Sequence, residues 1–150
     1  MTVPAIGLRV RFRDPDKPES VVTAQFATVR GHREMKDALD KCARLDVAEN
    51  IAIRRQILAS VRLQEAATEE ELTAAGEAYA AAVAAKDAAS LALIDATREF
   101  VEAGFRLAGA SDEQVEYLAS CVALEDLADL KAKAMFGAGV LDFTARGDRT

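Results

Sequence analysis

The sequence predicts a mainly α-helical fold with a short N-terminal β-hairpin, an α+β protein built as a helical bundle. Three observations carry this prediction. Apolar and polar residues alternate near the N-terminus, whereas from residue 30 onward apolar residues recur at helical spacing. No proline lies beyond residue 18, so nothing interrupts one long Ala-rich helix over about 68–108.

Residues 5–29 are expected to form the β-hairpin. Over residues 5–13 apolar side chains take every second position, the pattern of a half-buried strand. Residues 14–20 contain two prolines and predict a turn, since proline cannot donate to a ladder. Residues 21–29 are rich in β-branched and aromatic side chains and predict the returning strand.

Three arginines, Arg9, Arg11 and Arg13, share the polar face of the first strand. One interpretation is an exposed sheet face whose arginines pair with acidic side chains such as Glu19. The other is a basic strip that docks an acidic partner, including the acidic half of a neighbouring subunit.

Residues 30–136 are expected to form the helical body. Asp46 followed by Glu49 has the spacing of a capping box, which predicts that a second helix starts there. We expect the buried face of that helix to carry the large apolar side chains Ile51, Ile53, Ile57, Leu58 and Val61.

The long helix over 68–108 has a strong start signal, with Thr68 as N-cap and Glu71 at the matching third position. A seven-residue repeat then predicts a seam of large residues opposite small ones, suited to antiparallel or bundle packing. The large position holds Leu72, Tyr79, Lys86, Leu93, Phe100 and Leu107. The small position holds Ala75, Ala82, Ala89, Ala96 and Ala103. Because alanine is so common here, the same register also arises by chance.

The C-terminal part predicts one or two further helices. Ser111 and Gln114 form a capping box. The apolar stripe that follows loses its phase near Ala123, which predicts a kink or a new short helix. Glycines at 137 and 139 end the helical body, and residues 137–150 are expected to be a flexible tail.

Length and composition predict one domain over 1–150, with a thin core. The chain is 51% hydrophobic and 29% charged but only 5% aromatic. Alanine-rich helices bury little area per residue, so a partner or a homo-oligomer is expected to supply further burial. No long uncharged apolar stretch and no secretory signal is present, which predicts a soluble, cytoplasmic protein without a membrane contact.

Charge excludes nucleic acid as the expected partner. Residues 1–60 carry 11 Lys and Arg against 8 Asp and Glu, whereas residues 61–150 carry 8 against 17. Binding to a phosphate backbone needs clustered basic residues, which the acidic second half lacks.

The residue types and motifs of the sequence also predict that the protein is not an enzyme. His32 is the only histidine, so multi-histidine metal sites are excluded and any catalytic triad depends on one residue. No glycine-rich phosphate loop stands between a strand and a helix. We therefore expect no catalytic residue, cofactor or metal; the best enzymatic alternative pairs His32 with Cys42.

The order of the parts resembles a known family. A strand pair precedes the helices, and near the end the segments 100–107, 111–118 and 124–130 combine an acidic turn with a short Leu-rich helix. This pattern, over residues 5–30 and 98–137, resembles the small tail assembly chaperones of long-tailed bacteriophages and prophages. The resemblance implies a non-enzymatic protein that coats the tape-measure protein in the host cytoplasm until the tail tube polymerises.

Two functions of different class follow as expectations. The first is a protein-binding module, a tail assembly chaperone that shields a long helical tape-measure-type partner. The second is a structural homo-oligomeric helical protein of a phage or bacterial assembly, with residues 68–108 as its seam. The expected partner-binding residues are Arg9, Arg11, Arg13, Leu72, Tyr79, Leu93, Phe100 and Leu107.

Overall fold

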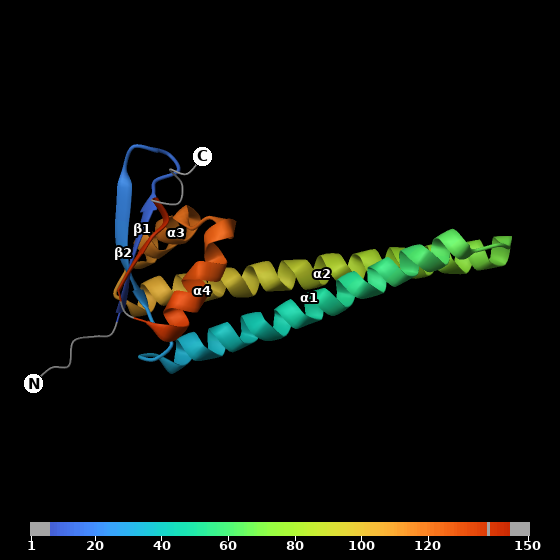
Figure 1. The fold of residues 1–150 in the computed structure, drawn as a ribbon, viewed down its shortest axis with the longest axis horizontal. Coiled ribbons are helices and arrows are strands. Elements are labelled where there is room, and N and C mark those ends of the chain that lie inside the picture. The colour runs from blue at the N-terminus through green and yellow to red at the C-terminus, as the bar shows by residue number, and fades with distance from the viewer. Residues whose placement is uncertain (1–6, 138, 145–150) are drawn as a thin grey trace, which may run out of the picture. The chain divides into compact units, whose positions relative to one another are not determined.

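The computed structural model describes residues 7–137 and 139–144 and confirms a mainly α-helical fold with a short β element (Figure 1). The strands are β1 (Gly7–Arg13), β2 (Val21–Ala27) and β3 (Gly139–Asp142). The helices are α1 (Arg33–Glu65), α2 (Glu69–Leu107), α3 (Asp112–Cys121) and α4 (Leu127–Phe136), with a 3₁₀ turn, η1, at Leu124–Asp126.

The structure has two compact units, and one domain over 1–150 stays a prediction. The first contains the described residues of 1–39 and 98–150, and the second is residues 40–97. Both long helices contribute to both units. We call the first the sheet unit and the second the helical hairpin, and describe each by itself.

The sheet unit is built on three strands in the order β2-β1-β3. β1 and β2 form the predicted antiparallel hairpin, with Leu8 opposite Phe26. β3 adds to the other edge of β1 in parallel, with Val10 opposite Leu141. We had placed residues 139–142 in a flexible tail from 137, and that assignment was wrong for β3. Residues 138 and 145–150 of that tail lie outside the described residues.

The core of the sheet unit lies between the apolar face of the sheet and the last turns of α2. The ring of Phe26 packs edge-on against Phe105, with centroids 5.0 Å apart, and tilted against Phe100, at 5.8 Å. Phe12 meets Phe105 at 6.3 Å. All four rings are at most 1% exposed. Gly104 allows this contact, because an added Cβ would stand 2.0 Å from Cζ of Phe26.

The ends of the helices in the sheet unit follow their sequence signals. After α2, Gly109 takes a positive φ of 106° and the N–H of Ala110 donates to the carbonyl of Phe105 at 3.1 Å, as in a Schellman motif. The predicted capping box of Ser111 and Gln114 starts α3. The predicted break near Ala123 is confirmed, since η1 and α4 follow it.

The helical hairpin consists of α1 from residue 40 and α2 up to residue 97, which run side by side (Figure 1). Thr68 caps α2 as predicted, its Oγ1 accepting from the N–H of Glu71 at 3.1 Å. The carboxylate of Glu71 accepts from the N–H of Ala67 at 2.9 Å. These bonds fix the tight connection between the helices.

The prediction that a helix starts at Asp46 was wrong, since α1 runs without interruption through this position. Capping spacing marks a start only where the preceding residues leave the helix. Residues 41–45 contain no glycine or proline that would end it.

Candidate functional site

The helical hairpin has almost no interior of its own. Its buried side chains are Cys42, Ala96 and Thr97, all close to the ends of its two segments. Every residue of 43–95 is described, and none of them is buried. Most of the stability of a helix in a protein comes from packing its apolar face, so this hairpin leaves apolar surface uncovered.

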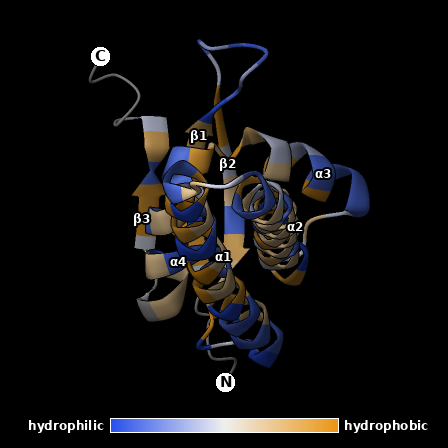
Figure 2. Cartoon of the chain, turned by 90° about the vertical axis from the view of Figure 1, so that its right-hand side faces the viewer, coloured by the Kyte–Doolittle hydropathy of each residue, from blue (hydrophilic) through white to orange (hydrophobic). Residues whose placement is uncertain are grey.

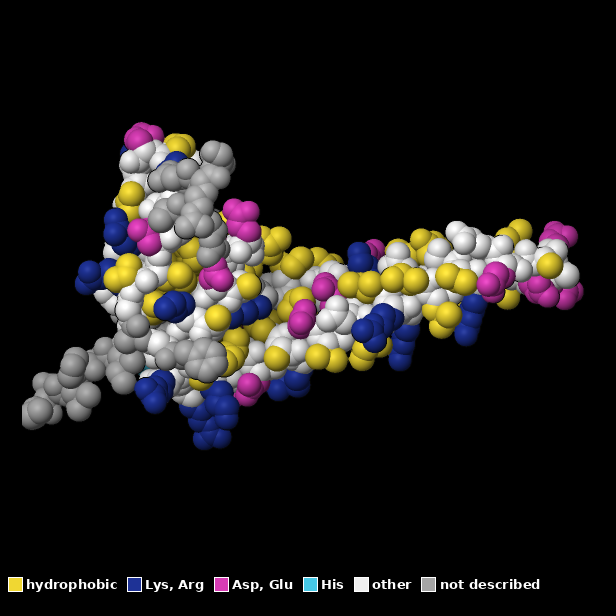
Figure 3. Space-filling model, in the orientation of Figure 1, with side chains coloured by type: hydrophobic (Ala, Val, Ile, Leu, Met, Phe, Trp, Pro, Cys, Tyr) yellow, Lys and Arg dark blue, Asp and Glu magenta, His cyan; other side chains and the backbone are white. Residues whose placement is uncertain are grey.

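Eight large apolar side chains of the hairpin are 42% to 62% exposed. They are Val47, Ile51, Ile57, Leu58, Val61, Leu72, Leu91 and Ile94. Viewed along the helices, apolar residues lie on several sides of α1 rather than on one (Figure 2). Apolar side chains also form a band along the hairpin in the space-filling view (Figure 3). Exposed apolar surface of this extent is typical of an interaction site.

Our prediction for the buried face of α1 was wrong for four of its five residues. Ile51, Ile57, Leu58 and Val61 are all at least 42% exposed. The side chains that α1 turns inward at heptad spacing are two leucines, one near each end of the hairpin segment, with alanines and polar residues between them. They are Leu45, Glu49, Ala52, Gln56, Ala59 and Leu63, all half-buried.

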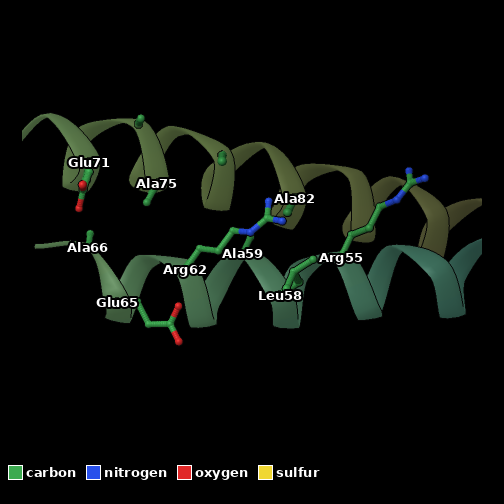
Figure 4. A pocket seen from close by; sticks show the side chains of 11 residues that line it. Arg55, Leu58, Ala59, Arg62, Glu65, Ala66, Glu71, Ala75 and Ala82 are labelled. Atoms are coloured by element: carbon green, nitrogen blue, oxygen red, sulfur yellow. The ribbon is translucent and has the colours of Figure 1, made fainter.

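A groove of about 580 Å³ lies between the two helices near their connection (Figure 4). Alanines form most of it, and Leu58 stands beside them on α1. Arg55 and Arg62 extend from α1 towards α2 (Figure 4). The alanines are Ala59, Ala66, Ala74, Ala75, Ala78 and Ala82. Small side chains allow another backbone to approach closely, so the groove can accommodate a third helix packed against α1 and α2.

The charges around the groove are unequal. Arg55 and Arg62 are exposed basic side chains on the α1 side, which also has the acidic Glu65 at its end. Glu71 is an acidic side chain on the α2 side. The long stems of the arginines can cover apolar surface while their guanidinium groups stay in water. An occupant with acidic side chains along one edge would complement the α1 side. The sequence analysis did not predict Arg55, Leu58 or Arg62 as binding residues, and Leu58 was expected to be buried. Their spacing of three and four residues was the available signal.

The arginines of the N-terminal strand lie together, as predicted. Arg9, Arg11 and Arg13 all point to the exposed face of β1, the central strand. Arg11 forms an ion pair with Asp142 of β3, at 3.7 Å between Nη1 and Oδ2, where both side chains remain partly exposed. Such pairs contribute little to stability, about 0–1 kcal/mol. The acid that pairs with Arg11 is therefore in β3 and is not Glu19.

The five apolar residues predicted on α2 do not form one surface. Leu72 is exposed, and Tyr79 and Leu93 are half-buried in the hairpin. Phe100 is completely buried in the sheet unit, so the folded chain does not offer it to a partner. Leu107 is half-buried at the end of α2.

One polar contact of the sheet unit joins distant parts of the sequence. Tyr117 donates from its hydroxyl to Oδ2 of Asp14 at 2.6 Å. This bond lowers the pKa of Asp14 below 3.8, helped by the N–H of Asp16, and raises the pKa of Tyr117 above 10.0. Burial raises the pKa of the neighbouring Cys121 thiol. A protonated, buried thiol is a poor nucleophile, so this group has the properties of a structural contact.

The remaining candidates for chemistry are isolated in the described part of the chain. Cys42 and Cys121 are both buried free thiols, and His32 is half-buried before the start of α1. Over residues 7–137 and 139–144, no three His, Cys, Asp or Glu side chains are grouped to hold a metal ion. None of the described helices combines the length and the apolar character needed to cross a bilayer.

Comparison with known proteins gives no relative: no family model, curated protein or solved structure matches this chain. The exposed apolar surface and groove of the helical hairpin are therefore the features on which a function can be argued.

Proposed function

We propose that this chain is a non-enzymatic protein-binding module that holds a helix of another polypeptide in the groove between α1 and α2. One observation carries the proposal. Across residues 43–95 the hairpin buries no side chain, while eight large apolar side chains are 42% to 62% exposed. A further helix in the groove would cover Leu58 and the groove alanines and give this part of the hairpin a core.

The groove specifies the chemistry of the bound helix. Its alanines favour a helix with an apolar stripe, which can lie close to them. Arg55 and Arg62 favour acidic side chains along the edge of that helix that faces α1. The expected ligand is thus an amphipathic helix with one acidic edge.

Within this class we propose a tail assembly chaperone, which shields a long tape-measure-type helix in the host cytoplasm. The order of elements supports it, with a strand pair first and the helix, acidic turn and short Leu-rich helix of residues 98–137 near the end, before β3. The exposed hairpin supplies a surface on which such a helix can be held. A structural homo-oligomer remains the alternative, and the same exposed surface favours it.

The first experiment uses a synthetic amphipathic helix of about 26 residues, ~39 Å long, which matches residues 40–65 of α1. One version has Glu along its edge and a second has Lys. Calorimetric titration of the full chain should show binding of the acidic version and at least about tenfold weaker binding of the basic one. If neither helix binds, the proposal is wrong.

A pair of variants tests the position of the ligand. Ala78 lines the groove and Ala84 does not, and both are exposed on α2. Ala78→Glu should weaken binding of the acidic helix by about tenfold or more, because a carboxylate would occupy the groove. Ala84→Glu should leave binding unchanged. Equal effects of the two would place the ligand elsewhere.

The chaperone version needs its own test. A long helical protein encoded beside this chain, expressed alone, should aggregate, and co-expression with this chain should keep it in solution. The Ala78→Glu variant should lose this effect and Ala84→Glu should retain it. Absence of any long helical protein among the neighbouring genes would argue for another partner.

A further inference from the structure

We infer that in the free protein a second copy of this chain covers the groove side of the hairpin. The groove lies near the connection, and the side of the hairpin that contains it extends along both helices, because residues three and four apart share a helix face. On α1 this groove face comprises Arg44, Ile51, Arg55, Leu58, Arg62 and Glu65. On α2 it comprises Glu71, Ala74, Ala78, Ala81, Ala85, Ala88, Ala92 and Asp95.

The two halves of the groove face are complementary in size. The α1 half has two large apolar side chains, Ile51 and Leu58, which are 46% and 50% exposed. The α2 half has only alanines between its acidic ends. A twofold axis through the face lays α1 of each copy on α2 of the other, so that the large side chains meet the small ones.

The two halves are also complementary in charge. The α1 half is basic on balance, with Arg44, Arg55 and Arg62 against Glu65. The α2 half has Glu71 and Asp95 and no basic residue. Along the whole hairpin, residues 40–65 carry five Lys and Arg against four Asp and Glu, and residues 69–97 carry one against six. Packing α1 on α2 of a second copy brings opposite charges together, and packing α2 on α2 does not.

The area of the face is enough for a stable dimer. Residues 40–65 span about 39 Å of helix, and two helices side by side are roughly 20 Å wide, which gives about 800 Å² per copy. A standard specific interface buries about 800 Å² per partner. The partner helix of the proposed function would then have to displace the second copy, and this part of the inference rests on the proposed function.

Sedimentation velocity of the full chain tests the dimer. The wild-type chain should be a dimer at about 100 μM and dissociate on dilution. Leu58→Glu and Ala85→Glu should each raise the dissociation constant by about a hundredfold, because each dimer contains the change twice. Both positions are exposed, so helix content measured by circular dichroism should stay unchanged.

Ala84→Glu is the matched control, one residue away and off the groove face. It should remain a dimer with the wild-type dissociation constant. A wild-type chain that is monomeric at about 100 μM overturns the inference, even if it binds the acidic helix and so supports the proposed function. A dimer that none of the groove-face variants weakens overturns it as well.

Displacement is measured by adding the acidic synthetic helix to the dimer. Conversion to a complex of one chain and one helix supports displacement. A dimer that binds the helix and stays intact overturns displacement but supports the dimer. A dimer that does not bind the helix supports the second copy as the occupant and counts against the proposed function.

Discussion

Substituting alanine for Gly76 or for Gly104, both in α2, should change the free energy of unfolding in opposite directions. An alanine at Gly76 meets no atom within 4 Å, so only the helix preference changes and the hairpin gains about 1 kcal/mol. An alanine at Gly104 gains the same amount, but its Cβ would stand 2.0, 2.2 and 2.6 Å from three atoms of the Phe26 ring. Those atoms are Cζ, Cε2 and Cε1.

The ring of Phe26 has no room to move. It is 0% exposed and lies between Phe100 and Phe105, at 5.8 and 5.0 Å. Inserting a methyl group into a packed core costs about 1–3 kcal/mol, and an approach to 2.0 Å corresponds to the upper end. After the helix gain is subtracted, Gly104→Ala should destabilise the sheet unit by about 2 kcal/mol.

The assay is urea unfolding followed by tyrosine fluorescence in a Tyr79→Phe background, where Tyr117 reports on the sheet unit. A double-mutant cycle with Phe26→Leu makes the test specific, because leucine lacks all three clashing atoms. In the Phe26→Leu background, Gly104→Ala should leave the free energy of unfolding unchanged or raise it slightly. The packing argument would be refuted if Gly104→Ala lowered the free energy of unfolding equally with Phe26 and with Leu at position 26. It would also be refuted if Gly104→Ala stabilised the protein as Gly76→Ala does.

Three further outcomes are expected. Gly109→Ala should destabilise the sheet unit by about 1–2 kcal/mol in the same assay, because φ is 106° there. Tyr117→Phe should lower the midpoint of urea unfolding at pH 7, followed by circular dichroism because the tyrosine reporter is removed. The bond lowers the pKa of Asp14 and raises that of Tyr117, so it stabilises the folded state most between pH 3.8 and pH 10.0. The difference in urea midpoint between wild type and Tyr117→Phe should therefore shrink below pH 3.8 and above pH 10.0. Buried Cys42 and Cys121 should react with a thiol reagent at pH 8 only after unfolding, and fast native reaction would contradict their burial.

Local signals in the sequence were sufficient for much of the fold. The Thr68 cap, the Ser111 capping box and the alternation of residues 8–12 each depend on neighbours within a few positions. The strand β3 could not be predicted in this way. It is four residues long, and its partner β1 lies about 130 residues earlier, so its pairing depends on the folded sheet unit.

The candidate site was only partly visible in the sequence, for a physical reason. In α2 the heptad register is clear, and Ala75, Ala82 and Ala89 are half-buried in the hairpin as it predicted. In α1 apolar residues lie on nearly every side between 47 and 63, so periodicity selects no face.

In the middle of α1, between the inward Leu45 and Leu63, the two faces differ in side-chain size. Ala52 and Ala59 turn inward, where small side chains let two alanine-rich helices lie together, and Ile51 and Leu58 remain outside. A hairpin optimised for its own stability would have the reverse arrangement, because burying a leucine contributes about 1.5–3 kcal/mol. Leaving Ile51 and Leu58 exposed lowers the stability of the isolated hairpin. These side chains can then be buried when the hairpin associates with another helix. This distribution of side-chain size is the reason for expecting a partner at the groove.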